Sequence, residues 1–158
     1  MKPRIYIETT LFNYYYDDER GFAHESTRVL INEIADCKYQ AFTSTYVTDE
    51  LEAATPEKRD KMLSLIKQYD IKVLAPSEEA TRIANLYIQE NIIPIKFRTD
   101  SLHIAVATIN NLDMIISLNF KHIVKMKTKK LTADINIKNG YKAIEIYSPM
   151  EVIDYENE

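Results

Sequence analysis

The sequence is poor in the residues on which several common kinds of functional site depend. It has only two glycines, Gly21 and Gly140, so no Gly-rich loop can cradle a phosphate as in P-loop or dinucleotide-binding proteins. Cys37 is the single cysteine, which excludes an internal disulfide and any zinc site built from several cysteines. Three large classes of site are therefore excluded before any motif is considered.

Long apolar runs and an excess of positive charge are missing as well. No stretch approaches the roughly 20 apolar residues that span a bilayer. The start, Met1 to Ile5, lacks the apolar core of a signal peptide. These absences predict a cytoplasmic protein with no membrane partner. The formal net charge is −4, so any binding of nucleic acid must come from a local basic patch.

What remains is the composition of one globular domain. Hydrophobic residues make up 46% of the chain and charged residues 28%, which is far from the composition of a disordered protein. The length of 158 residues fits a single domain spanning 1–158. Within it, residues 151–158 form an acidic tail that we expect to be exposed to solvent.

Short β-branched and aromatic segments alternate with segments of helical period. The helical period is clearest at Ala80, Ile83, Ala84, Tyr87 and Ile88. Strands joined by helices imply parallel pairing, because a crossover helix returns the chain to the same end of the sheet. The pattern predicts a three-layer α/β/α sandwich with a mostly parallel central sheet of about five strands. The predicted strands are residues 4–8, 39–43, 71–74, 113–118 and 143–147.

Helix starts are marked by hydroxyl residues that cap free backbone N–H groups. Thr9 and Thr10 follow the first strand, and Ser44 with Thr45 precedes a helix that carries Glu50. Further starts are predicted at 55–57, where a threonine, a proline and an acid follow one another, and at 148–151.

Four polar residues stand where a parallel sheet binds its ligands, at the carboxyl ends of strands. Glu8 closes the first strand, Asn119 follows the fourth, Asp100 begins a helix and Glu50 lies on the helix after the second strand. Three carboxylates and one amide would form an oxygen-rich site of the kind that Mg²⁺ or Mn²⁺ prefers. A divalent ion there could polarise a phosphodiester and lower the pKa of an attacking water.

Each residue taken singly also has a simpler explanation. Asp100 fits a helix cap, Glu50 a solvated helix charge, and Asn119 a residue of a turn. His103 shares a helix face with Asp100 and is either an accessory of the site or a satisfied histidine at the edge of the core.

The order of the blocks resembles the PIN domain family. Ile5-Tyr6-Ile7-Glu8-Thr9-Thr10 resembles its opening strand, which usually ends in D-T/S-S/N, and Val47-Thr48-Asp49-Glu50-Leu51 looks like its second-acid block. Thr99 to Ala107 is similar to the D-A-x-I-A-A helix that holds the third acid. Asp113 to Asn119 resembles the strand before the fourth site, usually L-V-T-x-D. The likeness runs from about Pro3 to Ile153, and its most specific part is Asp100 to Asn119.

This resemblance implies a ribonuclease that depends on Mg²⁺ or Mn²⁺, of the VapC-like kind found in toxin–antitoxin pairs. It implies RNA as substrate, an antitoxin protein as partner, and a homodimer as a common assembly. By position, Glu8, Glu50, Asp100 and Asn119 become the catalytic and metal-binding residues. Glu8 and Asn119 stand where the family usually has Asp, although Leu118-Asn119-Phe120-Lys121-His122 is similar to a W-N-x-K-H variant. These departures motivate an alternative, a catalytically weak PIN-like module that binds RNA or a protein partner.

A basic run follows Asn119, with six cationic or imidazole side chains between residues 121 and 130. We expect Lys121, Lys125 and Lys127 to hold the RNA backbone, with His122 as an accessory residue. The alternative is a solvated helix face. Tyr14 to Tyr16 offer rings that stack on bases, or that pack in the core or in a dimer contact.

Overall fold

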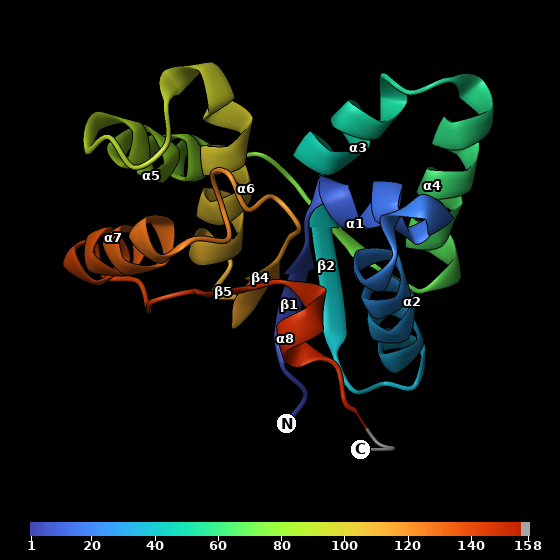
Figure 1. Ribbon diagram of the computed structural model, residues 1–158. Coiled ribbons are helices and arrows are strands. Elements are labelled where there is room, and N and C mark those ends of the chain that lie inside the picture. The colour runs from blue at the N-terminus through green and yellow to red at the C-terminus, as the bar shows by residue number, and fades with distance from the viewer. Residues whose placement is uncertain (156–158) are drawn as a thin grey trace.

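The computed structural model describes residues 1–155, and this part of the chain forms five strands, eight α-helices and two short 3₁₀ helices, η1 and η2 (Figure 1). The elements in chain order are β1 (Arg4–Ile7), α1 (Thr9–Tyr15), η1 (Asp18–Arg20), α2 (Phe22–Ala35), β2 (Gln40–Ser44), α3 (Thr45–Glu52), α4 (Pro56–Gln68), β3 (Lys72–Leu74), α5 (Glu78–Gln89), η2 (Ile95–Phe97), α6 (Arg98–Ile109), β4 (Met114–Ile116), α7 (Met126–Lys138), β5 (Glu145–Tyr147) and α8 (Pro149–Val152).

The described strands form one sheet in the order β3-β2-β1-β4-β5, and every neighbouring pair is parallel. Helices α5, α6 and α7 lie on one side of the sheet, and α1, α2 and α4 lie on the other (Figure 1). The expected three-layer α/β/α class is confirmed, and the described sheet is wholly parallel. All five predicted strands are present, although most are shorter than the apolar runs that predicted them.

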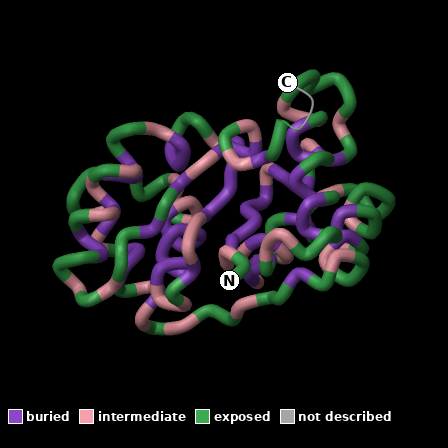
Figure 2. Tube along the Cα trace, turned by 90° about the horizontal axis from the view of Figure 1, so that it is seen from below, coloured by how far each residue is buried: buried purple, intermediate pink, exposed green. Residues whose placement is uncertain are grey.

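The core lies on both faces of the two central strands. Ile5 and Ile7 of β1 and Ile115 and Ile116 of β4 are fully buried, because helices cover both sides of a parallel sheet. Buried segments run through the middle of the molecule and exposed segments form its outer helices (Figure 2). This packing explains why the central strands read as unbroken apolar runs in the sequence.

The strand order reverses next to β1, and this reversal positions the candidate site. From β1 the chain builds β2 and β3 on one side, then returns to add β4 and β5 on the other. Ile7 of β1 pairs with Ile116 of β4, and the backbone N–H of Glu8 donates to the Ile116 carbonyl at 3.1 Å. The carboxyl ends of β1 and β4 therefore meet at the switch point, where ligands of such sheets bind.

One local expectation is corrected by the structure, and one helix was not revealed by apolar periodicity. Glu8, rather than Thr9 or Thr10, is the N-cap of α1, because its backbone is extended and its side chain accepts the Thr10 N–H. The helix α7 was not expected from apolar periodicity. Its buried positions include Thr128, Thr132 and Asn136, which are polar and give no apolar period. The caps at Ser44, Thr55 and Ser148 lie where the sequence predicted them.

The expectation of a solvent-exposed tail from residue 151 is wrong for its first part. Glu151 completes a capping box with Ser148, and Ile153 is buried. The backbone N–H of Asp154 donates to Glu33 at 2.9 Å. Residues 156–158 of that tail lie outside the described residues. None of the helices within residues 1–155 has the length and apolar character needed to cross a bilayer.

With few glycines available, the chain ends its helices on other residues in the left-handed region. Four residues beyond the ends of α2, α4, α5 and α6 have φ between 53° and 64°, and each lies two positions after the last helical residue: Cys37, Asp70, Asn91 and Asn111. Only after α7 does a glycine, Gly140, take such a position among the described helix ends. Asparagine and aspartate adopt this conformation more readily than other side chains, whereas cysteine does so at a cost.

Candidate active site at the carboxyl edge of the sheet

Glu8 follows β1 directly, and its carboxylate is turned into the structure. Only 3% of the residue is exposed. Its Oε1 accepts from the Thr10 N–H at 3.2 Å, the Thr10 hydroxyl at 2.5 Å and the Ser117 hydroxyl at 2.7 Å. No donor among residues 1–155 reaches Oε2. One oxygen is therefore fixed by Thr10 at the start of α1 and by Ser117 directly after β4, while the other keeps its lone pairs.

Glu50 is held in a similar way from α3. Its Oε1 accepts from the Thr9 hydroxyl and from His103 Nε2, both at 2.7 Å. Burial alone would raise the pKa of Glu50, but the hydrogen bond and positive charge of His103 outweigh it, so this pKa lies below its usual value. Burial likewise lowers the pKa of His103, and the Glu50 hydrogen bond with the nearby carboxylates raises it above the usual value. The two side chains form a salt bridge with the carboxylate 41% exposed and the imidazole fully buried.

The other nitrogen of His103 is used as well. Nδ1 shares a hydrogen bond of 2.6 Å with the hydroxyl of Tyr6, which also lies 2.7 Å from the Ser44 hydroxyl. Tyr6 is fully buried in β1, and burial raises the pKa of its phenol well above the usual value. The phenol therefore stays neutral and can donate. Of the two explanations for His103, the structure shows a histidine whose ring nitrogens are both satisfied.

Asp100 lies in the first turn of α6, as expected. Burial raises its pKa to about 6; the positive charge of His103 lowers it, and the negative charges of Glu8 and Glu50 raise it further. A hydrogen bond from the side chain of Asn119 also lowers this pKa. The Asn119 Oδ1 accepts the backbone N–H of His122 at 3.0 Å. The NH₂ group of Asn119 is therefore the donor to Asp100.

The structure thus brings Glu8, Glu50, Asp100 and Asn119 to one edge of the sheet from four different segments. Hard oxygen donors and mutual repulsion between carboxylates are the chemistry that suits a divalent cation. Within residues 1–155, however, no three His, Cys, Asp or Glu side chains are grouped closely enough to hold a metal ion as they stand. The donor set therefore fits Mg²⁺ or Mn²⁺ in its chemistry, and binding an ion would require the carboxylates to move closer together.

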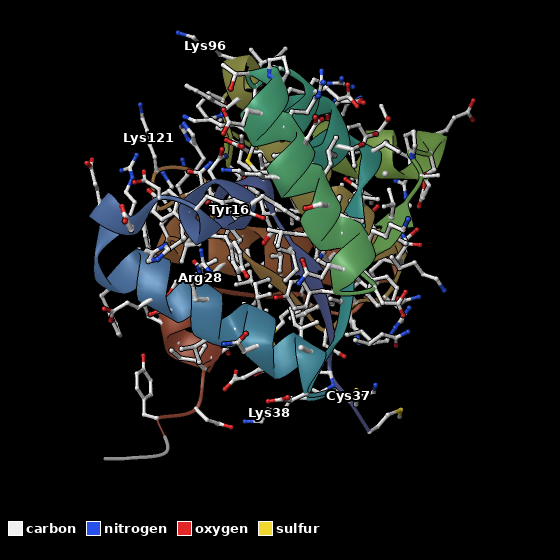
Figure 3. All side chains as sticks on the ribbon, turned by 90° about the vertical axis from the view of Figure 1, so that its right-hand side faces the viewer. Tyr16, Arg28, Cys37, Lys38, Lys96 and Lys121 are labelled. Atoms are coloured by element: carbon white, nitrogen blue, oxygen red, sulfur yellow. The ribbon has the colours of Figure 1, made fainter. Side chains whose placement is uncertain are left out.

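The lysine run does not form a single face. Lys121 lies over the ring of Phe97 at 5.6 Å, beside the start of α6 that carries Asp100 (the side chain is labelled in Figure 3). Lys125 is the N-cap of α7 and Lys127 is exposed in its first turn. Lys129 instead pairs with Glu151 at 3.7 Å. Within the basic patch of Lys121, Lys125 and Lys127, Lys121 is therefore the residue that lies beside the start of α6.

His122 is packed away from solvent beside this patch. Its ring lies against Phe97 with centroids 4.1 Å apart, and both ring nitrogens are buried without a hydrogen-bond partner in the described structure. Burial and the charges of Lys121 and Lys125 lower the pKa of His122. As folded, this imidazole cannot touch a substrate, so it packs beneath the basic patch.

The tyrosines after β1 divide between core and surface. Tyr15 is buried, with the guanidinium of Arg28 4.0 Å from its ring centre. Tyr14 and Tyr16 line a cavity of about 690 Å³ between α1 and α4. The Tyr16 hydroxyl donates to the backbone carbonyl of Lys61, which fixes that ring. Two of the three rings thus face a cavity that also contains cationic side chains.

Sequence reasoning missed the hydroxyl groups that orient the carboxylates. They are Tyr6, Thr9, Thr10, Ser44 and Ser117. One signal was present, since a tyrosine in a fully buried strand must find a partner for its hydroxyl. The serine and threonine partners carried no such signal, because the same residues are common in turns.

Comparison with known proteins reaches only the level of the fold. No family model matches the sequence, and no curated protein matches it. Among solved structures, the chain is similar to one chain in the crystal structure of VapBC2 from Rickettsia felis bound to a DNA fragment from their promoter, with a TM-score of 0.59. The match covers 92% of this chain and 98% of that one at 12% sequence identity. The chain therefore shares the fold of a component of VapBC2.

Proposed function

We propose that the protein is a metal-dependent endoribonuclease that hydrolyses phosphodiester bonds of RNA. The observation that carries the proposal is that Glu8, Glu50 and Asp100, from the N-cap of α1, from α3 and from α6, lie close enough together at the switch point for the charges of Glu8 and Glu50 to act on Asp100. Burial is the main cause of the raised pKa of Asp100, and repulsion from Glu8 and Glu50 raises this pKa further. A bound divalent cation would relieve that repulsion, since it supplies the missing opposite charge.

Each residue has a part in this proposal. Glu8 and Glu50 would hold Mg²⁺ or Mn²⁺ through Oε2, the oxygen that receives no donor among the described residues. Asp100 is the third carboxylate, and Asn119 orients it and borders the site through Oδ1. The ion supplies charge to polarise the phosphodiester and to lower the pKa of an attacking water.

The basic residues beside the site would hold the RNA backbone. Lys121, Lys125 and Lys127 follow Asn119 directly, so a strand bound by them would pass the carboxylates. Lysine contacts phosphate without reading the base, which suits a patch that positions RNA. Sequence preference would have to come from other groups, such as Tyr14 and the cavity that it lines.

The proposal is tested by incubating the purified protein with a labelled single-stranded RNA. We expect cleavage with Mn²⁺ or Mg²⁺, none in EDTA, and a loss of at least about 100-fold in Asp100→Asn, because the variant removes a charge from the site. Asp134→Asn is the matched control, because Asp134 is exposed on α7. We expect this variant to cleave RNA as wild type does. Cleavage that survives EDTA, or that Asp100→Asn retains, would contradict the mechanism.

The alternative function predicts a different result in the same cleavage assay. A catalytically weak module would bind RNA without cutting it at any concentration of Mn²⁺. The occupied Oδ1 of Asn119 is the observation that favours this alternative, because it leaves one lone pair of that oxygen for an ion.

A protein partner is also proposed, on the basis of the shared fold. The similar structure is a VapBC2 assembly, and its name describes two components. A toxin role would require an antitoxin encoded beside this chain. Co-expression with any adjacent short reading frame, followed by purification, tests this: a toxin should arrest growth alone and co-purify with its antitoxin when both are expressed.

A further inference from the structure

His103 connects the candidate carboxylates to the scaffold of the protein. The residue is completely buried on α6, between β1 and α3. One ring nitrogen donates to Glu50 Oε1 on α3, and the other is bonded to the Tyr6 hydroxyl on β1. Three elements far apart in the sequence therefore meet at a single imidazole.

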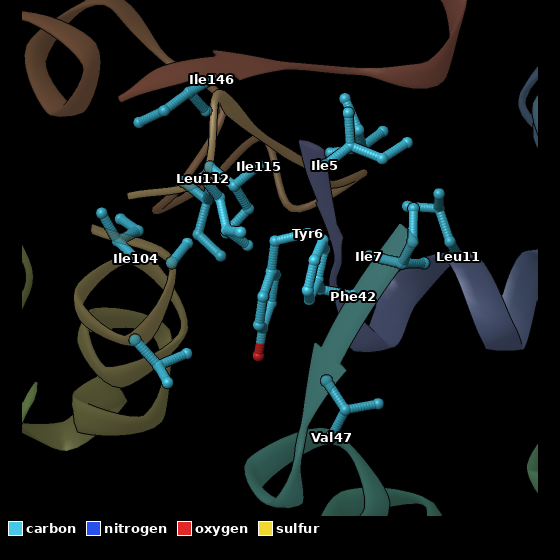
Figure 4. Packing of buried hydrophobic residues seen from close by; sticks show 14 of the residues in the cluster. Ile5, Tyr6, Ile7, Leu11, Phe42, Val47, Ile104, Leu112, Ile115 and Ile146 are labelled. Carbon is cyan, nitrogen blue, oxygen red and sulfur yellow. The ribbon is translucent and has the colours of Figure 1, made fainter. Parts of the chain in front are cut away.

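The same network reaches α3 a second time, at its beginning. The Tyr6 hydroxyl lies 2.7 Å from the Ser44 hydroxyl, and Ser44 caps α3 by accepting the Tyr46 N–H at 3.2 Å. Figure 4 shows the Tyr6 hydroxyl directed away from the sheet core, between the helix that bears Ile104 and the helix that bears Val47. Helix α3 is thus tied to β1 and α6 at its N-cap as well as at Glu50.

The position of His103 on its own helix sets the geometry of the site. Asp100 lies three residues earlier, on the same face of α6 and one turn away. The bond from His103 to Glu50 therefore fixes how far the α3 carboxylate stands from the α6 carboxylate. Thr9 donates to the same Glu50 oxygen, so Oε1 is occupied on both sides and Oε2 is left for a ligand.

We propose that Tyr6 and His103 are positioning residues that set the divalent-ion affinity of the site by holding Glu50 at a fixed place relative to Asp100. The inference rests on the proposed function and extends it to residues that do not touch the ion. Groups that hydrogen-bond a ligating carboxylate restrict its rotation, and their loss typically weakens metal binding by about 10- to 100-fold.

If this network had a purely structural role, its loss would lower stability without changing the affinity for the ion. The protein contains a second buried tyrosine network, in which the Tyr87 hydroxyl donates to Asn136 Oδ1 at 2.5 Å and lies 3.3 Å from the Thr108 hydroxyl. Tyr87 is as fully buried as Tyr6. Its network of Thr108 and Asn136 contains no carboxylate, whereas the network of Tyr6 reaches Glu50 through His103. Tyr87→Phe is therefore a matched control for Tyr6→Phe, because each change removes one buried hydroxyl.

The experiment measures Mn²⁺ binding by titration calorimetry, without RNA, for wild type, Tyr6→Phe and Tyr87→Phe. Urea denaturation of each protein reports stability separately. We expect Tyr6→Phe to weaken Mn²⁺ binding about 10-fold and Tyr87→Phe to leave it within about twofold, with both variants destabilised. Thr9→Val removes the other donor to Glu50 Oε1 and should also weaken Mn²⁺ binding. This second variant allows the test to be made if Tyr6→Phe folds poorly.

The outcomes distinguish a failure of the positioning role from a failure of the proposed function. If wild type binds Mn²⁺ and both Tyr6→Phe and Thr9→Val bind it equally well, the network is structural and the inference is overturned, while the proposed function stands. If wild type binds no Mn²⁺, the proposed function fails and the inference fails with it. Weaker binding confined to Tyr6→Phe and Thr9→Val supports the positioning role.

Discussion

Asp100 is the residue of the candidate site at which burial and charge oppose one another most directly. An aspartate in water titrates near 4, but burial raises the pKa of Asp100 to about 6. The folded protein therefore keeps a proton between pH 4 and 6 that the unfolded chain has already lost. Stability falls as the pH rises through this window, and above it the ionised carboxylate opposes folding.

This shift predicts that Asp100→Asn stabilises the protein when no divalent ion is present. At pH 7.5 we expect the free energy of unfolding to rise by about 1–2 kcal/mol, a value reduced from the full pKa shift because Asp100 is partly exposed. At pH 3.5 the gain should vanish, since both states then carry a protonated aspartate. Urea denaturation in EDTA at the two pH values measures this, with Asp134→Asn as control.

A destabilised Asp100→Asn at pH 7.5 would contradict the prediction. It would mean that the carboxylate contributes more through His103 and the dipole of α6 than it loses through burial. In many enzymes a carboxylate needed for activity lowers the stability of the fold. The change in the free energy of unfolding of Asp100→Asn measures the corresponding effect in this protein.

The helix ends show how individual elements adapt to the scarcity of glycine. Cys37 follows α2 with φ of 64°, a conformation in which a Cβ atom contacts the following carbonyl. Aspartate and asparagine at the other helix ends tolerate it better, because their side chains bond locally to the backbone.

Replacing this residue should therefore improve the end of α2. We expect Cys37→Gly to raise the free energy of unfolding by about 0.5–1 kcal/mol, since the relief of strain exceeds the entropy lost by glycine. Ala35→Gly, within the last turn of the same helix, should lower it by a similar amount. Thermal or urea denaturation of the two variants checks the sign, and a loss of stability in Cys37→Gly would refute the account.

Elements whose local pattern agrees with their tertiary place were predictable from sequence. The strands and α5 carry apolar residues at the positions that face the core, so their period revealed them. Apolar periodicity did not predict helix α7, because three of its four buried residues are Thr128, Thr132 and Asn136. Each of these three is satisfied by hydrogen bonds to other elements or to its own helix. Apolar periodicity cannot find a helix that packs through polar groups.

The candidate site was likewise predictable from the sequence only in part. The strand-end rule located Glu8 and Asn119, since the edge to which a residue belongs follows from topology. The contacts that orient them could not be read from the chain, because Ser117 reaches Glu8 across 109 positions. The spacing of Glu50 and Asp100 likewise depends on how α3 and α6 pack, which no local pattern encodes.

For the whole molecule, the net charge of −4 means that the proposed binding of RNA would depend on the local basic patch after β4. Changing Lys121, Lys125 and Lys127 to Glu should weaken binding of every RNA by a similar factor, because lysine contacts phosphate and not base. Each lost contact should reduce the slope of log affinity against log salt by about 0.7 for a single strand. Filter binding of two unrelated RNAs, in the Asp100→Asn background, measures both quantities.

A second triple variant controls for charge alone. Lys67, Lys72 and Lys138 are exposed on α4, β3 and the end of α7, so their replacement by Glu gives the same net charge. We expect that control to change the affinity far less and to keep the salt slope. If the two triple variants behave alike, the RNA-binding surface lies elsewhere, and the cavity with Tyr14 and Tyr16 becomes the next place to test.

The outer strands of the described sheet have a consequence for how the molecule can associate. Both β3 and β5 are three residues long, and each begins with an exposed charged residue, Lys72 or Glu145. Such short, charged edges offer little unpaired backbone for another strand to join. Strand addition is therefore a poor route to aggregation or peptide capture, and a homodimer or an antitoxin would have to dock on the helical layers.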